Sequence, residues 1–124
     1  MCKVIADLHN ALFFLHSEND KILTIPNITK NAKKPIASCD TIIVFTQHAV
    51  DGSVEIYLDI FKEKPNNFIQ VFYKNIIFDG EYLCATDPDA MQLCKLTLPK
   101  KYSGISIWVN DVNFPSIIKV FIVL

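Results

Sequence analysis

The chain has 124 residues, and its 13 acidic and 12 basic side chains give a formal net charge of −1 at pH 7. All the basic residues are lysines, and because phosphate clamps and base readout rely on bidentate arginine, this composition argues against a nucleic-acid-binding protein or a phosphoryl-transfer enzyme. Hydrophobic residues make up 51% of the chain, yet no apolar run reaches the roughly 20 residues of a membrane helix, so we expect a soluble protein with no membrane partner.

The length fits one domain, residues 1–124, with a single hydrophobic core. The start of the chain lacks the long apolar stretch and cleavage site of a signal peptide, so we expect an unexported, cytoplasmic protein. Cys2, Cys39, Cys84 and Cys94 have spacings that match neither a metal site nor a secreted disulfide framework, and we expect them to stay reduced. A Cys84–Cys94 bridge across a turn is the alternative, and we favour two small core residues over it.

The first predicted strand covers residues 10–16, where the aromatic pair Phe13 and Phe14 favours a strand over a helix. A polar turn and a short strand at residues 21–25 follow. Residues 26–35 are rich in Asn, Lys and Pro, which predicts a loop. Loops of this kind often carry binding sites.

The next two strands are expected at residues 41–47 and 54–61. Between them, Asp51 and Gly52 are the residue types that a tight hairpin turn favours at positive φ. In the second strand, the alternating apolar residues must face the core and the residues between them must face outward. The outward set is Glu55, Tyr57, Asp59 and Phe61.

Five further strands are expected at residues 68–73, 76–85, 95–98, 104–109 and 117–124. Asp79 and Gly80 mark a bulge or bend in the second of these, and residues 86–89 form a turn that leads into one short helical turn at residues 90–91. Strands spaced this regularly, without an amphipathic helix of useful length, predict an all-β, single-domain antiparallel β-sandwich of about eight or nine short strands.

Three histidines, His9, His16 and His48, are the candidates for acid-base chemistry, with Asp7 or Asp51 as the carboxylate that orients a base. No nucleophile elbow, glycine-rich phosphate loop or zinc motif accompanies them, and the chain has only three glycines. We therefore expect ordinary surface histidines and no enzymatic activity.

Asp87 and Asp89 lie two residues apart, a spacing that calcium ligands can have. Calcium takes about six to eight oxygen ligands, and the neighbouring residues supply few. We expect a turn at these residues rather than a metal site, and we expect the protein to need no cofactor.

Residues 95–109 (KLTLPKKYSGISIWV) combine a strand, a Leu-Pro turn at Pro99, Tyr102 and a second strand that contains Trp108. Together with the bulged strand at residues 78–85 and the hairpin around Asp51 and Gly52 before them, they resemble the competence protein J family of all-β nuclease inhibitors, and they are similar to the immunity-type β-sandwiches that accompany bacterial toxins. The resemblance spans residues 40–124 loosely. It implies a non-enzymatic inhibitor whose partner is a protein, namely a nuclease or a toxin.

A nuclease inhibitor must present carboxylates and aromatic anchors to a cationic cleft that is shaped for phosphate. Residues 40–89 hold nine acidic residues and three lysines, whereas the rest of the chain holds four acidic residues and nine lysines. We therefore expect the partner-binding surface in this stretch, with Tyr57 as a hot spot. Its residues are Asp51, Glu55, Tyr57, Asp59, Asp79 and Glu81. The alternative is that they form an ordinary solvated sheet face.

Two other functions fit a small β-sandwich. A carbohydrate or small-ligand module would need a cleft lined by Trp108, Tyr82 or Tyr102, so the exposure of Trp108 separates that function from inhibition. The apolar neighbours of Trp108 in its strand predict a core position. A structural or viral assembly protein is the third alternative, since richness in Lys, Asn and Ile reflects an AT-rich genome that many kinds of organism share.

Overall fold

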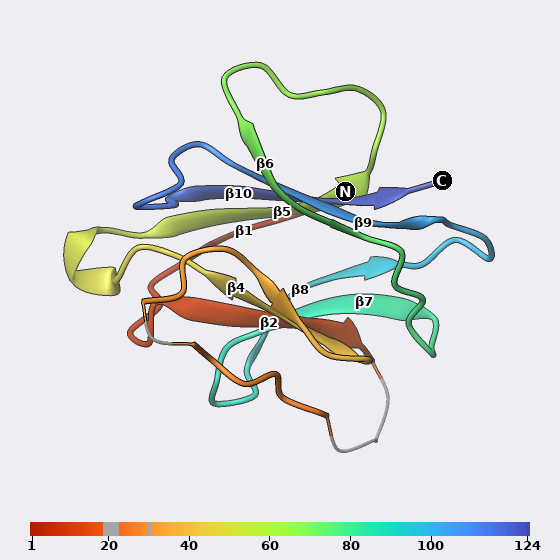
Figure 1. Ribbon diagram of the computed structural model, residues 1–124, viewed down its shortest axis with the longest axis horizontal. Helices are drawn as coiled ribbons and strands as arrows, with labels where there is room; N and C mark the ends of the chain where they lie inside the picture. Colours follow the sequence, from red (N-terminus) through yellow and green to blue (C-terminus); the bar gives the residue numbers. More distant parts are fainter. Residues whose placement is uncertain (19–22, 30) are drawn as a thin grey trace.

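The computed structural model describes residues 1–18, 23–29 and 31–124. Over these residues the chain forms ten β-strands and one 3₁₀ turn, and the strands build two five-stranded sheets that lie face to face (Figure 1). The predicted all-β sandwich is confirmed. Its strands are short, from two to seven residues, as the regular spacing of turn residues in the sequence indicates.

Sheet A is the upper layer in Figure 1, and its strand order is β1-β5-β10-β9-β6. Its strands are β1 (Cys2–Ala6), β5 (Val54–Ile60), β6 (Ile69–Lys74), β9 (Gly104–Val109) and β10 (Ile117–Val123). β10 runs parallel to β5, with Ile118 opposite Ile56, whereas the other adjacent pairs of this sheet are antiparallel. β10 therefore occupies the centre of the sheet and not an edge.

Sheet B is the lower layer, with the order β3-β4-β2-β7-β8 and antiparallel pairing throughout. Its strands are β2 (Leu12–Ser17), β3 (Ile36–Ala37), β4 (Thr41–Phe45), β7 (Tyr82–Thr86) and β8 (Gln92–Thr97). The edges of this sheet are β3 and β8, and those of sheet A are β1 and β6.

The hydrophobic core lies between the two sheets. In β5, Val54, Ile56 and Leu58 are fully buried and the residues between them are half-buried, so the predicted alternation is confirmed. The other fully buried core residues are Phe13, Leu15, Ile42, Leu83, Ala85, Ile105, Ile107, Ile118, Val120 and Ile122. Full burial of each Val, Leu, Ile or Phe side chain stabilises the folded state by about 1.5–3 kcal/mol. The inner faces are thus occupied, which leaves the outer faces, the edges and the loops for contacts with other molecules.

The connection between β4 and β5 is not the hairpin that Asp51 and Gly52 predict. β4 pairs with β2 and β3 in sheet B, whereas β5 pairs with β1 and β10 in sheet A. The chain crosses between the sheets here, through the 3₁₀ turn η1 (Ala49–Asp51). Gly52 has a φ of 127°, whereas the φ of Asp51 is not positive. A turn is present as predicted, but it is not a hairpin turn, and the pairing prediction is wrong.

The predicted strand at residues 76–85 is also wrong in its first part. β7 begins at Tyr82, and the residues before it carry the chain from β6 in sheet A to sheet B. Gly80 has a φ of 144°, and the Ser17 hydroxyl donates a hydrogen bond to the carbonyl oxygen of Asp79 over 2.5 Å. The bend at Asp79 and Gly80 is therefore a crossing between sheets and not a bulge within a strand. β8 begins at Gln92 and not at the predicted residue 95.

The turn between β7 and β8 contains no helical turn, contrary to prediction. The Asp87 carboxylate accepts a hydrogen bond from the Met91 N–H over 2.9 Å, and Ala90 has a φ of 64°. A side chain that accepts bonds from the backbone in this way favours a tight turn over a helix. The prediction of a turn at these residues is confirmed.

β1 has no counterpart among the predicted strands. Residues 4–17 are mostly apolar, so the local pattern does not mark the break between two strands, which is a turn at Ala11 with a φ of 57°. β2 confirms the strand predicted at residues 10–16. The strand predicted at residues 21–25 begins in residues 21–22, which lie outside the described residues, and residues 23–25 form no strand.

The cysteines differ from both predictions. Cys2 and Cys94 form a disulfide, with their Cα atoms 6.1 Å apart, whereas Cys39 and Cys84 are free. Ala85, not Cys84, is opposite Cys94 in the β7–β8 pair, and because successive side chains point to opposite faces, Cys84 faces outward while Cys94 faces the core. Cys84 is nevertheless buried, and burial raises the pKa of its thiol.

Candidate protein-binding surface

The outer face of sheet A carries three of the predicted partner-binding residues in one row. Glu55, Tyr57 and Asp59 alternate with the buried residues of β5, and each is half-buried. β5 has β1 on one side and β10 on the other, so the row runs along an interior strand whose position is fixed from both sides. We call these three residues the β5 row.

Two lysines flank Tyr57, the middle residue of the β5 row. Lys3 of β1 and Lys119 of β10 both lie opposite Tyr57 in the strand register, and their Nζ atoms lie 5.2 Å and 5.4 Å from the centre of its ring. Lys3 Nζ is also 3.9 Å from Glu55 Oε1. Interaction with Tyr57, and then with Glu55, raises the pKa of Lys3. The β5 row is therefore a charge-compensated stripe around an aromatic ring and not a purely acidic face.

An aromatic cluster covers another part of this outer face. Trp108 alternates with the core residues of β9 and so points away from the core, yet only 7% of its surface is exposed. Phe61 stacks on Trp108 with ring centroids 6.5 Å apart, and the edge of its ring meets Phe121 at 5.5 Å. Figure 1 shows the connection from β5 to β6 rising above sheet A. Trp108 is thus buried as predicted, but beneath Phe61 and not between the sheets.

The three aromatic residues that a small-ligand cleft would need lie in different places. Trp108 is covered by Phe61 on sheet A. Tyr82 belongs to sheet B, where Lys95 Nζ lies 4.3 Å from its ring centre. The hydroxyl oxygen of Tyr102 accepts a hydrogen bond from a backbone N–H over 2.7 Å. A buried tryptophan offers no ring for stacking with a ligand, which weakens the carbohydrate alternative.

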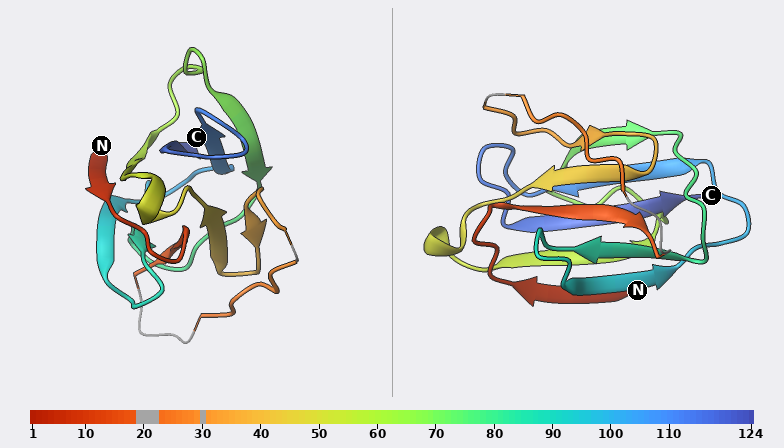
Figure 2. Two further views of the ribbon diagram at one scale, coloured as in Figure 1. Left: turned by 90° about the vertical axis from the view of Figure 1, so that its left-hand side faces the viewer. Right: turned by 90° about the horizontal axis from the view of Figure 1, so that it is seen from below.

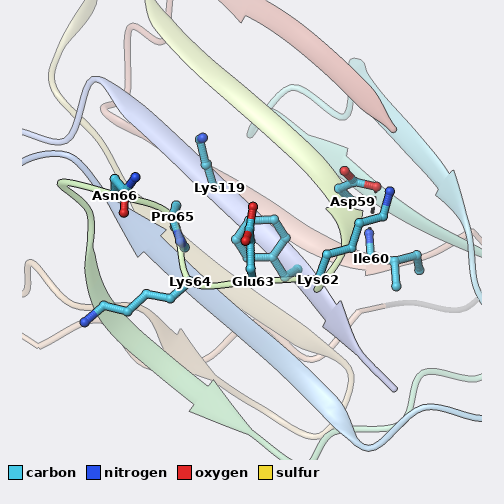
Figure 3. A pocket seen from close by; sticks show the side chains of 9 residues that line it. Asp59, Ile60, Lys62, Glu63, Lys64, Pro65, Asn66 and Lys119 are labelled. Atoms are coloured by element: carbon cyan, nitrogen blue, oxygen red, sulfur yellow. Dashed lines mark hydrogen bonds between the residues drawn. The ribbon is translucent and has the colours of Figure 1, made fainter.

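A cavity of about 270 Å³ lies beside the β5 row, between β10 and the β5–β6 connection (Figure 3). Its charged lining residues are Asp59, Lys62, Glu63, Lys64 and Lys119. Small-molecule sites are mostly apolar with a few convergent polar groups. Because this cavity interleaves lysines with carboxylates, it is better suited to water or to the side chains of a protein partner.

The other three predicted residues lie away from the β5 row. Asp51 is the last residue of η1, at the end of the sandwich where β5 begins (Figure 1). Asp79 and Glu81 are in the β6–β7 connection at the opposite end. The structure therefore brings the β5 row together and separates Asp51 from Asp79 and Glu81.

His9, His48 and Asp7 take part in loop contacts, whereas His16 lies in β2 with its Nε2 3.0 Å from the Thr86 hydroxyl. His48 Nδ1 accepts a hydrogen bond from the Val50 N–H over 3.0 Å and so caps η1. The rings of His9 and His48 meet edge to face, with centroids 6.3 Å apart. Asp7 Oδ1 accepts a hydrogen bond from the Ser53 hydroxyl over 2.6 Å. Asp7 is thus engaged by a serine, which is a structural role.

Two classes of site are absent from the part of the chain that the structure describes. Across residues 1–18, 23–29 and 31–124, no group of three or more His, Cys, Asp or Glu side chains could hold a metal ion. In the same ranges, no helix has the length and apolar character needed to span a membrane.

Sequence reasoning missed Lys3 and Lys119 as neighbours of Tyr57. Each is a polar residue in an otherwise largely apolar strand, a pattern that marks it as outward-facing. That pattern does not say which strands are neighbours. Lys3 lies in a strand that was not predicted, and Lys119 reaches Tyr57 only through the parallel pairing of β5 with β10.

Comparison with known proteins identifies a shared fold. No family model and no curated protein sequence matches this chain. Its structure is similar to that of ComJ from Bacillus subtilis, an inhibitor of the DNA degrading activity of NucA. The two chains superpose with a TM-score of 0.66 at 14% sequence identity, over 99% of this chain and 92% of that one. The resemblance that residues 95–109 indicate is confirmed at the level of the fold.

Proposed function

We propose that this chain is a non-enzymatic inhibitor that binds and blocks a nuclease or a related bacterial toxin. The observation that carries the proposal is the likeness to ComJ, which extends over 99% of this chain and is not limited to one motif. Fold alone does not determine function. The proposal therefore also depends on whether the surface of this chain suits a protein partner.

The β5 row supplies the features that such a partner requires. Tyr57 is a half-buried aromatic residue held between two lysines, and a ring that is already positioned loses little conformational freedom on binding. Glu55 and Asp59 on either side of it provide carboxylates for a cationic cleft. In our proposal Asp51 extends the contact toward the start of β5, whereas Asp79 and Glu81, at the other end, lie outside it.

The proposal places the protein in the cytoplasm, and the cysteines provide a test of this location. Cytosolic thiols are kept reduced, whereas disulfides persist in oxidising compartments. A cytoplasmic location predicts that Cys2 and Cys94 are labelled when acid-quenched cells are denatured in a thiol-alkylating reagent, since Cys94 is buried in the folded chain. Protection of both residues, with Cys39 labelled, would assign the protein to an oxidising compartment.

The function is tested by DNA degradation with purified proteins. The nuclease encoded nearest to this chain's gene is assayed with and without the chain, and we expect stoichiometric loss of DNA cleavage. A variant with Tyr57→Ala and Asp59→Lys should bind at least about 30-fold more weakly, because a central aromatic anchor contributes about 2 kcal/mol or more. Thermal unfolding of this variant should stay close to that of the wild type, since both side chains lie outside the core.

The matched control is Glu81→Lys, a charge reversal at the opposite end of the sandwich. It should leave affinity within about twofold of the wild type. If the wild-type chain leaves nuclease activity intact, the proposed function is wrong. If inhibition occurs and the Tyr57 variant inhibits equally well, the function stands and the β5 row is not the contact.

A further inference from the structure

Four loops with an unusual charge lie together at one end of the sandwich. These loops, which we call the loop end, are residues 7–11, 46–53, 87–91 and 110–116 (Figure 2, left). They contain five aspartates and no lysine, in a chain with 13 acidic and 12 basic residues. The aspartates are Asp7, Asp51, Asp87, Asp89 and Asp111. The loop end is therefore acidic, although Lys33 and Lys34 border it: Lys33 Nζ donates a hydrogen bond to Asn113 Oδ1 over 3.2 Å, and Lys34 lines a cavity with Val112.

The four loops are connected to one another by direct contacts. The Ala49 N–H donates a hydrogen bond to the Leu8 carbonyl over 3.2 Å, which joins the first two loops. The Gln47 N–H donates to the Pro115 carbonyl over 2.9 Å, which joins the second loop to the fourth. The first and third loops line a common cavity. The loop end is thus one continuous surface.

Two of the aspartates also fix the shape of their own loops. Asp87 Oδ1 accepts hydrogen bonds from the N–H groups of Asp89 and Met91, over 3.0 Å and 2.9 Å. Asp111 Oδ1 accepts a hydrogen bond from the Phe114 N–H over 3.2 Å. Loops that are held in this way lose less conformational freedom on binding than unconstrained loops do.

Each of three loops displays an apolar side chain to solvent. Val50 is 86% exposed, Met91 65% and Phe114 64%. Every one of them lies within three residues of an aspartate of the loop end. Single exposed apolar residues are common on protein surfaces, but three on one continuous acidic surface match the composition of an interface, in which apolar anchors are surrounded by charge.

We propose that the loop end is a docking surface for a basic protein, with Val50, Met91 and Phe114 as its apolar anchors. This inference rests on the proposed function, and it identifies the part of the partner concerned: the Lys- and Arg-lined cleft with which a nuclease holds phosphate. Asp51 connects this surface to the β5 row, because only Gly52 and Ser53 separate it from β5.

Charge excludes the other classes of occupant. Nucleic acids and anionic lipid surfaces are repelled by five carboxylates, which outnumber the bordering Lys33 and Lys34. Within residues 1–18, 23–29 and 31–124, these carboxylates form no metal-binding group of three. A cationic protein surface is attracted by the same charge, which speeds its association.

The test measures binding to two purified nucleases, NucA of Bacillus subtilis and the nuclease encoded nearest to this chain's gene. A charge variant carries Asp51→Lys with Asp89→Lys, and an anchor variant carries Val50→Ala with Phe114→Ala. We expect each variant to raise Kd at least about tenfold. The charge variant should do so through slower association, and its association rate should depend less on salt.

Controls come from the opposite end of the sandwich. Glu81→Lys matches the charge reversal, and Ile77→Ala matches the anchor variant, since Ile77 is 64% exposed, as Phe114 is. Both controls should stay within about twofold of the wild-type Kd. If the Lys substitutions reduce the thermal unfolding midpoint, Asp51→Asn with Asp89→Asn removes the charges with little change in shape, and the same loss of affinity is expected.

The outcomes separate this inference from the proposed function. Inhibition by the wild-type chain together with unchanged Kd in the loop-end variants overturns the docking surface and leaves the function standing. Equal losses in the loop-end variants and in the controls also overturn it. If the wild-type chain inhibits neither nuclease, the proposed function is wrong, and the loop end as a nuclease-docking surface is wrong with it.

Discussion

A disulfide joins Cys2 of β1 to Cys94 of β8. β1 is an edge of sheet A and β8 is an edge of sheet B, so the bond closes one side of the sandwich. The two cysteines are 92 positions apart in the chain. In the entropic account of disulfide stabilisation, a cross-link between such distant residues strongly lowers the conformational entropy of the unfolded chain and so stabilises the folded one.

Removal of this disulfide should destabilise the protein without abolishing the fold of the sheets. We expect Cys2→Ser to lower the free energy of unfolding by about 2–5 kcal/mol, measured by urea denaturation without reductant. Dithiothreitol should lower the stability of the wild type to the same extent. Cys39→Ser is the control, because Cys39 is exposed and free. Equal stability of the Cys2 variant and the wild type would contradict the bond.

The hydroxyl of Tyr102 should stabilise the crossing between the sheets. The Phe78 N–H donates a hydrogen bond to Tyr102 Oη over 2.7 Å, and Phe78 is buried. Tyr102→Phe leaves that N–H without an acceptor, and we expect a loss of about 1–3 kcal/mol in urea denaturation. Tyr73→Phe is the matched control, since Tyr73 is exposed, and it should change stability by less than about 0.5 kcal/mol.

The same tyrosine should affect stability at alkaline pH. Burial raises the pKa of Tyr102 above its ordinary value of 10.0, and the Phe78 N–H opposes part of this shift. Because the folded pKa is the higher one, the contribution of Tyr102 is fully present below pH 10 and is lost as pH rises through the folded pKa. We expect the urea midpoint of the wild type to fall more steeply above pH 10 than that of Tyr102→Phe. Parallel curves for the two proteins would rule out this contribution.

Phe61 should control the exposure of Trp108, the only tryptophan in the chain. Because Phe61 stacks on Trp108, Phe61→Ala should shift the fluorescence emission to longer wavelength and increase quenching by acrylamide. The loss of the ring pair should cost about 0.5–1.5 kcal/mol beyond the lost burial. Phe114→Ala, at the loop end, is the control and should leave the spectrum unchanged. An unchanged spectrum in the Phe61 variant would mean that something else covers Trp108.

Gly104 should be intolerant of any side chain. It is buried in β9, and a Cβ atom there would collide with the backbone carbonyl of Lys74 in β6. Backbone cannot move aside as a flexible side chain can, so we expect Gly104→Ala to cost about 1–3 kcal/mol. Hydrogen exchange should accelerate in β6 in particular. Lys101→Ala, at an exposed position nearby, should leave the β6 amides protected, and equal protection in the Gly104 variant would contradict the close approach.

The sequence predicts the elements whose pattern is local. β5 is the clearest example, because alternation over seven residues identifies both its buried and its outward side chains. That alternation is sufficient to assign Glu55, Tyr57 and Asp59 to one face of their strand. β2 and β9 are recognised for similar reasons, since their aromatic and β-branched residues favour strands.

Long-range pairing could not be predicted in the same way. A tight turn at Asp51 and Gly52 is compatible with a hairpin and with a crossing between sheets, and only the partners of β5 decide between them. The lysines beside Tyr57 and the bond between Cys2 and Cys94 depend on the same pairing. The loop end was missed for this reason too, since its aspartates are scattered along the sequence and meet only when the strands are ordered.

The position of β10 has a consequence for how the chain is made. A ribosome releases the chain from residue 1 onward, so β5 can pair with β1 early, while its other neighbour arrives only with residues 117–123. Until then sheet A has a gap at its centre, and the unpaired sides of β5 and β9 are open to other chains. A premature stop before residue 117 would therefore remove the middle of the sheet, and we expect such a product to depend on chaperones and to be degraded.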